Sequence, residues 1–262
     1  MNITAVVALY RGKGFTDEQA EVITLMRLGA GILFRAFPES FLLFGGATLL
    51  LFHDSPRHSG DLDLLSRTAE RPTIAAIQAV LDAGLDPAAE ALNLAPLQYE
   101  DASQGKLEMK LWVKAGDGRP LFRVDLNRFG SVLDSEIEEH NIAIDNDKLA
   151  TVKAASREFL LLQKAECFLL RRIVKVRDAF DIRLLTDAGA ALDHNLKAHF
   201  SDTLMSCEIE TEDILSRIEQ VDERRCRKEL EPVLPGEVFE SLARQGFKSL
   251  RDALHQLYAD WL

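Results

Sequence analysis

Two aspartates separated by one residue, Asp61 and Asp63, are the side chains of this sequence best suited to chemistry. They open the segment DLDLL, whose alternation of polar and apolar residues predicts a strand. On a strand both carboxylates project to one face, while Leu62 and Leu64 project to the other face, towards a core. Adjacent carboxylates repel each other unless a cation lies between them, and oxygen-only ligands suit Mg²⁺. The pair therefore predicts a magnesium site.

A glycine pair, Gly45 and Gly46, follows an apolar strand that begins at Phe41 and precedes a short apolar helix. Glycines allow the backbone to approach a bulky anion, and N–H groups at a helix start favour phosphate. Arg57 and Ser59 lie in the polar loop before the aspartates, where they either bind phosphate or cap the loop. A glycine turn and two solvated acids would be the simpler interpretation. The order of these features instead favours a magnesium–nucleotide site.

A third carboxylate, Asp125, lies on the polar face of a β-hairpin that alternation predicts over residues 107–127. On a strand next to the aspartate pair, Asp125 would either complete the magnesium site or deprotonate an attacking hydroxyl. The alternative is a solvent-facing acid that pairs with Arg123 or Arg128. The sequence leaves both interpretations open.

A charged helical stripe forms the third group of candidates. Lys164, Arg171 and Asp178 recur at steps of seven, and Lys175 follows one turn after Arg171. On one continuous helix these four side chains fall within an arc of roughly 60°, with Asp181 nearby. A separate apolar arc is predicted to face the core: Leu169, Ile173, Val176, Phe180 and Leu184. The stripe is either an exposed face laced with ion pairs or a positive surface for a triphosphate.

Composition narrows the class of protein. The chain has 262 residues and a formal net charge of −11, which argues against a protein dominated by non-specific binding to nucleic acid or anionic membranes. Three widely spaced cysteines, Cys167, Cys207 and Cys226, form no metal-binding pair. The longest apolar stretch, residues 41–52, is too short to span a bilayer, and the N-terminus lacks signal-peptide features. We expect a cytoplasmic protein without membrane segments.

The predicted architecture is α+β, with a mixed-sheet domain at residues 1–150 and a helical domain at 151–262. Residues 85–106 are expected to be irregular, and a proline-rich turn is expected at 232–237. Thr16 is the expected cap of the first helix. Periodicity and cap residues predict helices at 16–37, 73–84, 156–188 (one or two helices), 201–231 and 237–262.

In combination, these motifs resemble the AbiEii/AbiGii-type (MenT-like) nucleotidyltransferase family, which includes toxins of bacterial toxin–antitoxin and phage-defence systems. The family pattern is a hydrophobic strand, a glycine turn, R-x-S-x-D-x-D, a lysine followed seven residues later by arginine, and R/K-D-x-x-D. The sequence carries it as Gly45-Gly46, RHSGDLD, Lys164 with Arg171, and RDAFD. Residues 190–262 carry no such motif.

The resemblance implies a polymerase-β-like nucleotidyltransferase core followed by a helical domain. It implies that Asp61 and Asp63 bind Mg²⁺, in a one- or two-ion site, and that the glycine turn holds nucleotide phosphates. Lys164, Asp178 and Asp181 would be required for activity. The implied reaction (EC 2.7.7) transfers a nucleotide from an NTP to a hydroxyl acceptor, for which the tRNA 3′ end is one candidate. The implied partner is a cognate antitoxin.

Two alternatives share part of this pattern. A small-molecule nucleotidyltransferase that modifies an antibiotic or a metabolite would keep the glycine turn and the aspartates but would need an acceptor pocket. A non-catalytic protein of the same fold would bind a nucleotide or a partner without transfer. The nature of the labelled product after incubation with NTPs distinguishes these three functions.

Overall fold

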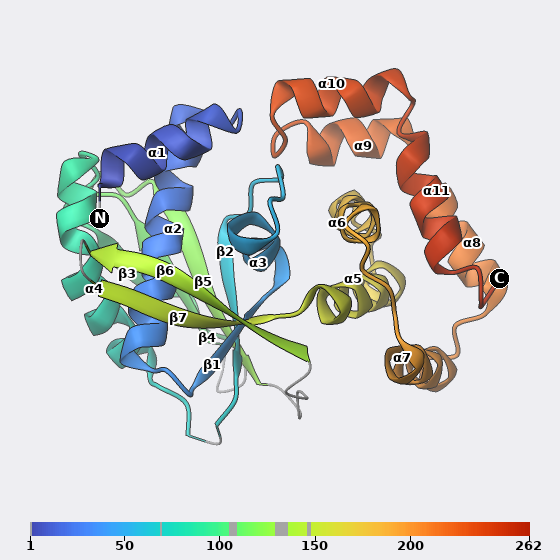
Figure 1. The fold of residues 1–262 in the computed structure, drawn as a ribbon, viewed down its shortest axis with the longest axis horizontal. Coiled ribbons are helices and arrows are strands. Elements are labelled where there is room, and N and C mark those ends of the chain that lie inside the picture. Colours follow the sequence, from blue (N-terminus) through green and yellow to red (C-terminus); the bar gives the residue numbers. More distant parts are fainter. Residues whose placement is uncertain (1, 69, 105–108, 129–135, 146–147) are drawn as a thin grey trace. The chain divides into compact units, whose positions relative to one another are not determined.

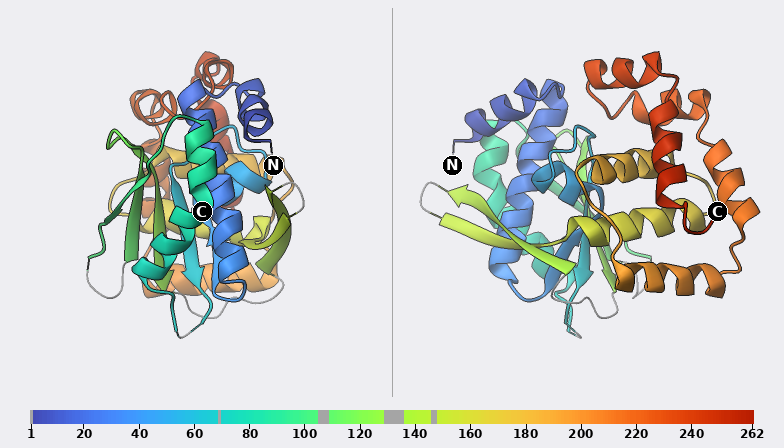
Figure 2. Two further views of the ribbon diagram at one scale, coloured as in Figure 1. Left: turned by 90° about the vertical axis from the view of Figure 1, so that its left-hand side faces the viewer. Right: turned by 45° about the vertical axis from the view of Figure 1, so that its right-hand side comes forward.

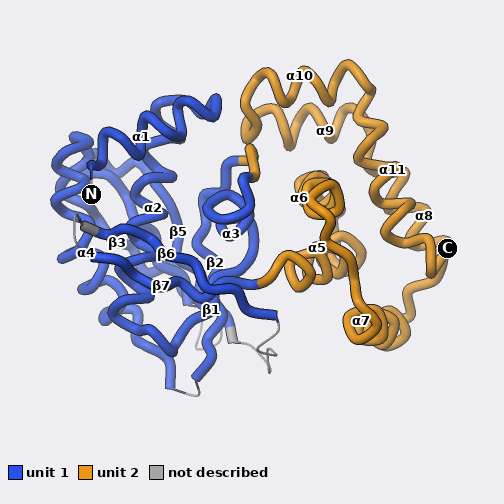
Figure 3. The backbone as a smooth tube through the Cα atoms, viewed as in Figure 1, with its two compact units in different colours: residues 1–54, 58–155 blue, residues 55–57, 156–262 orange. Residues whose placement is uncertain are grey.

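The computed structural model describes five stretches of the chain: residues 2–68, 70–104, 109–128, 136–145 and 148–262. The chain divides into two compact units (Figure 3). Unit 1 comprises Met1–Asp54 and His58–Ala155, and unit 2 comprises Ser55–Arg57 and Ser156–Leu262. The chain therefore enters unit 2 briefly, for three residues, before the aspartate pair. Each unit is described separately below.

Unit 1 is built on one mixed β-sheet (Figure 1). Its strands within the described residues are β1 (Phe41–Phe44), β2 (Asp61–Ser66), β3 (Gln98–Asp101), β4 (Met109–Lys114), β5 (Pro120–Arg128), β6 (Ile137–Asp145) and β7 (Lys148–Ala155). Their order in the sheet is β3-β4-β5-β2-β1-β7-β6. The pairs β1–β7 and β2–β5 are parallel, and the other neighbours are antiparallel. The predicted α+β class with a mixed sheet is confirmed.

Helices of unit 1 cover the sheet and complete the core. They are α1 (Ile3–Gly12), α2 (Asp17–Ala36), α3 (Gly45–Phe52) and α4 (Ile74–Ala91). Figure 2 shows α2 and α4 side by side against the sheet, where they contact each other and its strands. Thr16 caps α2 through a capping box with Gln19, as the sequence predicts. Leu62, Phe122 and the other inward-facing apolar residues of the central strands are fully buried.

The end of α4 is where a sequence expectation is wrong. Gly84 was expected to end this helix, but α4 continues through Pro87 to Ala91. A Cβ on Gly84 would lie 2.7 Å from the Cδ1 atom of Ile32 on α2. Gly84 is thus a close-contact residue between two helices, because a larger side chain would require the Ile32 side chain to move.

Residues beyond α4 also differ from expectation. The segment expected to be irregular contains β3, and the strands β6 and β7 were not predicted at all. Their sequences, IEEHNIAID and KLATVKAA, alternate polar and apolar residues too weakly to stand out as strands. The predicted hairpin is present as β4 and β5, with Phe122, Val124 and Leu126 facing the core.

Unit 2 is helical. Its helices within the described residues are α5 (Arg157–Leu170), α6 (Val176–Asp187), α7 (His194–Ser206), α8 (Thr211–Glu219), α9 (Glu223–Leu230), α10 (Gly236–Arg244) and α11 (Lys248–Leu257). Helix α6 contacts α5, α9 and α11 and lies at the centre of the unit. The long helices expected at 201–231 and 237–262 are therefore each divided. The second one breaks at Phe247, whose φ of 56° is left-handed.

The charged stripe of the sequence does not lie on one helix. Helix α5 ends at Leu170, and α6 begins at Val176. Ile173, expected in the apolar arc, lies in the connection and is 58% exposed. Lys175 becomes the residue before the first turn of α6. The predicted arc is wrong, because the break between α5 and α6 resets the angular relation between the residues on either side.

The C-terminal region packs onto the rest of unit 2. The Tyr258 hydroxyl donates a hydrogen bond to the Ala165 carbonyl on α5 at 3.0 Å, and both residues are buried. The Tyr258 ring also stacks against Phe168 and Phe200. The residues that carry no sequence motif therefore build the core that supports α5 and α6.

Candidate active site

Three carboxylates lie on two neighbouring strands of unit 1. Asp61 and Asp63 alternate on β2 with Leu62 and Leu64, which are fully buried. Strand β5 pairs with β2 in parallel, and the register places Asp125 directly beside Asp63. Side chains at paired positions project to the same face of a sheet. The sheet therefore gathers Asp61, Asp63 and Asp125 into one acidic cluster.

Gly45 is packed against this cluster. Strand β1 pairs with β2, and Phe44 lies opposite Asp63. A Cβ on Gly45 would lie only 2.3 Å from the Asp63 Oδ2 atom, and the φ of Gly45 is +75°. Both observations require glycine, since a side chain would collide with the carboxylate and L-residues rarely adopt this φ. The Asp63 carboxylate thus lies beside the first residues of α3, which are Gly45 and the buried Gly46.

Arg123 joins two members of the acidic cluster. Its Nε and Nη2 atoms bind the two oxygens of Asp125 at 2.5 and 2.7 Å. Its Nη2 atom also lies 3.3 Å from Asp61 Oδ2, and its guanidinium covers the Trp112 ring at 5.1 Å. The ion pair that the sequence left open for Asp125 is formed, although Asp125 is 7% exposed and does not face solvent.

The sequence offered Arg123 as a partner of Asp125 but not of Asp61. The contact with Asp61 follows from the β2–β5 register, which pairs Arg123 with Asp61 and cannot be known before the strand pairing. Ser59, a predicted phosphate ligand, lies half-buried in the loop before β2. Its assignment as a nucleotide ligand stays a prediction.

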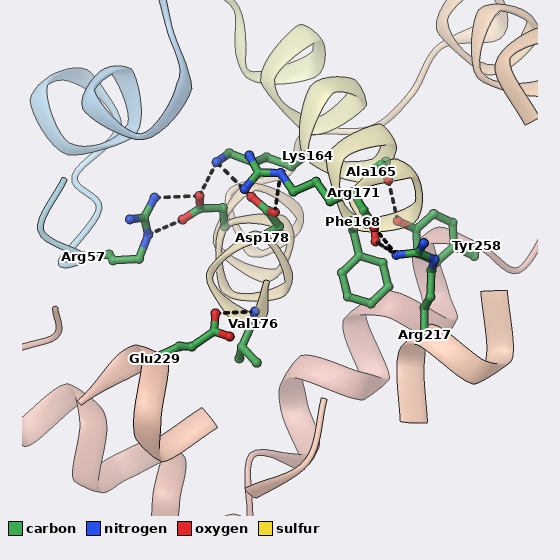
Figure 4. A network of polar contacts seen from close by, with 11 residues as sticks. Arg57, Lys164, Ala165, Phe168, Arg171, Val176, Asp178, Arg217, Glu229 and Tyr258 are labelled. Atoms are coloured by element: carbon green, nitrogen blue, oxygen red, sulfur yellow. Dashed lines mark hydrogen bonds and ion pairs between the residues drawn. The ribbon is translucent and has the colours of Figure 1, made fainter. Parts of the chain in front are cut away.

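Unit 2 holds a buried network of ion pairs (Figure 4). Arg57 binds both oxygens of Asp181 through Nε and Nη2, each at 2.8 Å. Lys164 Nζ lies 2.6 Å from Asp181 Oδ2 and 3.4 Å from Asp178 Oδ1. Arg171 Nε lies 3.5 Å from Asp178 Oδ2. We refer to these five residues as the buried charge network.

The two aspartates of the network are fully buried, and its cations outnumber them by three to two. Burial acts to raise the pKa of the Asp181 carboxyl, but the charges and hydrogen bonds of Arg57 and Lys164 outweigh burial and hold this pKa below its usual value. Asp181 is therefore a stable anion. Among the described residues, Asp178 Oδ2 receives no hydrogen bond that satisfies geometric criteria.

The network assembles differently from the predicted stripe. Lys164 comes from α5 and the aspartates from α6, two helices that pack together. Arg57 joins them from the three-residue excursion into unit 2, 124 positions before Asp181. The sequence offered Arg57 as a phosphate ligand. In the structure its guanidinium binds the Asp181 carboxylate.

Two further residues support the network and were missed by sequence reasoning. Arg217 Nη1 donates to the carbonyls of Phe168 and Arg171 at 3.1 and 2.9 Å, which fixes the end of α5. Glu229 accepts the Val176 N–H at 3.0 Å at the start of α6 (Figure 4). Both contacts satisfy backbone groups at helix ends, and neither has a local sequence signal.

Three solved structures resemble this fold over nearly the full chain. JHP933 from Helicobacter pylori has a TM-score of 0.54 and 14% identity, covering 94% of this chain and 94% of that chain. A second Helicobacter pylori structure, of a candidate nucleotidyltransferase, has the same score and identity and covers 94% and 97%. The nucleotidyltransferase toxin MenT4 from Mycobacterium tuberculosis also scores 0.54 at 14% identity, covering 96% and 90%. The fold is that of the nucleotidyltransferases.

The family assignment follows from the sequence as a whole. The model of the AbiEii nucleotidyl transferase toxins of type IV toxin–antitoxin systems matches residues 28–257, and the chain belongs to this family. The predicted resemblance is thereby confirmed. No curated protein sequence matches the chain. Among the helices of the described residues, none has the length and apolar character needed to cross a membrane.

Proposed function

We propose that this protein is a Mg²⁺-dependent nucleotidyltransferase that transfers a nucleotide from an NTP to a hydroxyl acceptor. The single observation that carries this proposal is the register that places Asp125 beside Asp63, with Asp61 two residues away on the same strand. Membership of a nucleotidyltransferase toxin family supports the reaction class. The same membership supports a toxin that acts in the cytoplasm and is neutralised by an antitoxin.

The acidic cluster fits a magnesium ion. Its donor set is oxygen-only, as Mg²⁺ prefers, and two of its carboxylates, Asp61 and Asp125, bind the same cation, Arg123. Asp61, Asp63 and Asp125 would hold the ion. When bound, Mg²⁺ neutralises charge on the triphosphate and makes the α-phosphorus more susceptible to attack. Arg123 orients Asp61 and Asp125 for this task, because it binds both.

Backbone and cationic groups bind the nucleotide in this proposal. The first turn of α3, at Gly45 and Gly46, offers N–H groups to phosphate oxygens, since the first four N–H groups of a helix have no partner within it. Lys164 and Arg171 supply positive charge to the phosphates as negative charge develops on them, in the roles that the family resemblance implies.

The transfer step needs a base and a leaving group. The acceptor oxygen attacks the α-phosphorus, the bond from that phosphorus to the bridging oxygen breaks, and pyrophosphate leaves with the bond electrons. The hydroxyl proton passes to a carboxylate base, for which the family resemblance makes Asp178 the first candidate. Asp125 is the alternative base, but Arg123 engages both of its oxygens. Asp181 positions Lys164 and Arg57 and keeps its charge.

Transfer from α-labelled NTPs to total RNA, resolved by mass, tests the proposal. The Asp61→Asn, Asp63→Asn double variant should lose Mg²⁺-dependent labelling, and Asp82→Asn should not, because Asp82 is an exposed acid on α4 of the same unit. Labelling of the tRNA 3′ end would identify tRNA as the acceptor. Full transfer by the double variant would refute the site assignment, and labelling of a small molecule alone would favour an antibiotic- or metabolite-modifying enzyme.

A further inference from the structure

A cluster of two histidines and one glutamate lies in unit 1, apart from the acidic cluster. Its members are His53, Glu138 and His140, and one ligand atom from each lies within 4.8 Å of the others. All three residues are half-buried. His53 is the C-terminal cap residue of α3, and Glu138 and His140 belong to the edge strand β6.

The fold fixes the positions of these side chains. Glu138 and His140 are two residues apart on β6 and share a face with the fully buried Ile142. The His140 ring stacks on Phe52 with a centroid distance of 4.2 Å and an interplanar angle of 6°. His53 meets the edge of His140 at 5.9 Å and 85°. Ring stacking and strand pairing therefore hold the two imidazoles and the carboxylate close to one another.

The spacing suits a metal with short bonds to nitrogen and oxygen. Two ligands at 2.0–2.2 Å from a tetrahedral Zn²⁺ lie roughly 3.3–3.6 Å apart. The distance from His140 Nε2 to Glu138 Oε2 is 3.3 Å. His53 supplies the third ligand atom, which lies within 4.8 Å of the other two. Two histidines and one carboxylate are a ligand set that zinc and related transition metals use in proteins.

We propose that His53, Glu138 and His140 bind a first-row divalent transition metal of the Zn²⁺ class and that the ion ties the edge strand β6 to the end of α3. This site is separate from the acidic cluster. Gly45, which contacts Asp63, begins the eight-residue helix α3, and His53 follows its other end, about 12 Å away. The ligand chemistry differs as well. Imidazole favours transition metals, whereas Mg²⁺ binds the oxygen ligands of the acidic cluster.

Titration of the untagged, chelator-treated full-length chain with Co²⁺ in millimolar Mg²⁺ tests the proposal. Excess Mg²⁺ occupies oxygen sites, so the visible absorption of Co²⁺ reports nitrogen-containing sites. We expect one equivalent to bind and Zn²⁺ to displace it. Loss of one ligand in His53→Ala or Glu138→Gln should raise the dissociation constant for Co²⁺ at least about tenfold. Tenfold is the lower end of the loss seen when a group that only supports a metal ligand is removed.

His199 provides a matched control: its Nε2 atom lies 3.3 Å from a Glu166 carboxylate oxygen, but among the described residues it belongs to no group of three possible metal ligands. His199→Ala should keep the Co²⁺ spectrum unchanged. His140→Phe keeps the stacking on Phe52 and removes only the ligand nitrogens, so its far-UV circular dichroism should match the wild type while Zn²⁺ no longer raises its melting temperature. Equal Co²⁺ affinity in wild type and His53→Ala, or no binding by wild type up to 1 mM Co²⁺ (roughly −4 kcal/mol), would overturn the proposal.

Discussion

The substitution Asp181→Asn tests how far the buried charge network stabilises unit 2. The replacement keeps the shape of the side chain and removes its charge. Arg57 and Lys164, which are 4% and 7% exposed, would then face a neutral amide in place of a carboxylate. Both cations would be left close together in a buried environment with one fewer anion.

The structure sets the size of the effect. Removal of one partner from a buried, hydrogen-bonded ion pair costs about 3–5 kcal/mol, because the other charge stays buried without compensation. The Arg57–Asp181 contact is bidentate at 2.8 Å, the geometry in which such pairs are strongest. With a urea dependence of about 1.5 kcal/mol per molar, the unfolding midpoint should fall by about 2–3 M.

Tryptophan fluorescence reports this unfolding for unit 2 alone. The chain has two tryptophans, Trp112 on β4 of unit 1 and Trp261 in unit 2. In a Trp112→Phe background, the remaining Trp261 packs edge-on against Phe200 and donates a hydrogen bond to Ser201 at 2.9 Å. Its emission in a urea titration therefore follows the loss of structure in unit 2.

Asp187→Asn is the matched control on the same helix, α6. Asp187 pairs with Arg183 at 3.2 Å, but its side chain is 61% exposed, and exposed pairs contribute about 0–1 kcal/mol. If Asp181→Asn lowered the free energy of unfolding no more than Asp187→Asn, the reasoning about the network would be refuted.

The stability difference between the wild type and Asp181→Asn depends on pH with a definite sign. The folded-state pKa of Asp181 is depressed, and an unfolded aspartate titrates near about 3.9. The stabilisation is therefore fully present above the unfolded pKa and is lost as the pH falls through the folded pKa. The difference in the free energy of unfolding between the wild type and Asp181→Asn should be largest near neutral pH and should decrease below about pH 4.

Three further substitutions test local packing. Gly45→Ala should abolish Mg²⁺-dependent NTP transfer, because its methyl group would lie 2.3 Å from Asp63 Oδ2. Its control is Gly118→Ala, which also lies at positive φ but whose methyl group, apart from its chain neighbours, would meet no heavy atom of the described residues within 4 Å. Gly118→Ala should cost only about 1–2 kcal/mol of stability and keep transfer. Gly84→Ala should destabilise unit 1 by about 1–3 kcal/mol in urea unfolding, since its methyl group would lie 2.7 Å from a side chain of α2, and an unchanged midpoint would contradict this contact. Tyr258→Phe should lower the unfolding free energy by about 0.5–1.5 kcal/mol, because it removes the buried hydrogen bond to the Ala165 carbonyl at 3.0 Å. An unchanged unfolding free energy would argue against this bond.

The sequence by itself determined what depends on near neighbours in the chain. Alternation predicted that Asp61 and Asp63 share a face and that Leu62 is buried, because strand periodicity is a local property. The cap at Thr16 was equally local. The order and spacing of the motifs were sufficient to indicate the family that the match over residues 28–257 confirms.

The tertiary structure decided which distant segments meet. The pairing of β2 with β5 places Asp125 beside Asp63, and the packing of α6 brings Arg57 to Asp181 across 124 residues. No periodicity specifies such contacts, because they depend on strand order and helix packing. The role of Gly84 shows the same limit: a glycine near the expected end of a helix resembles a cap until the neighbouring helix is in place.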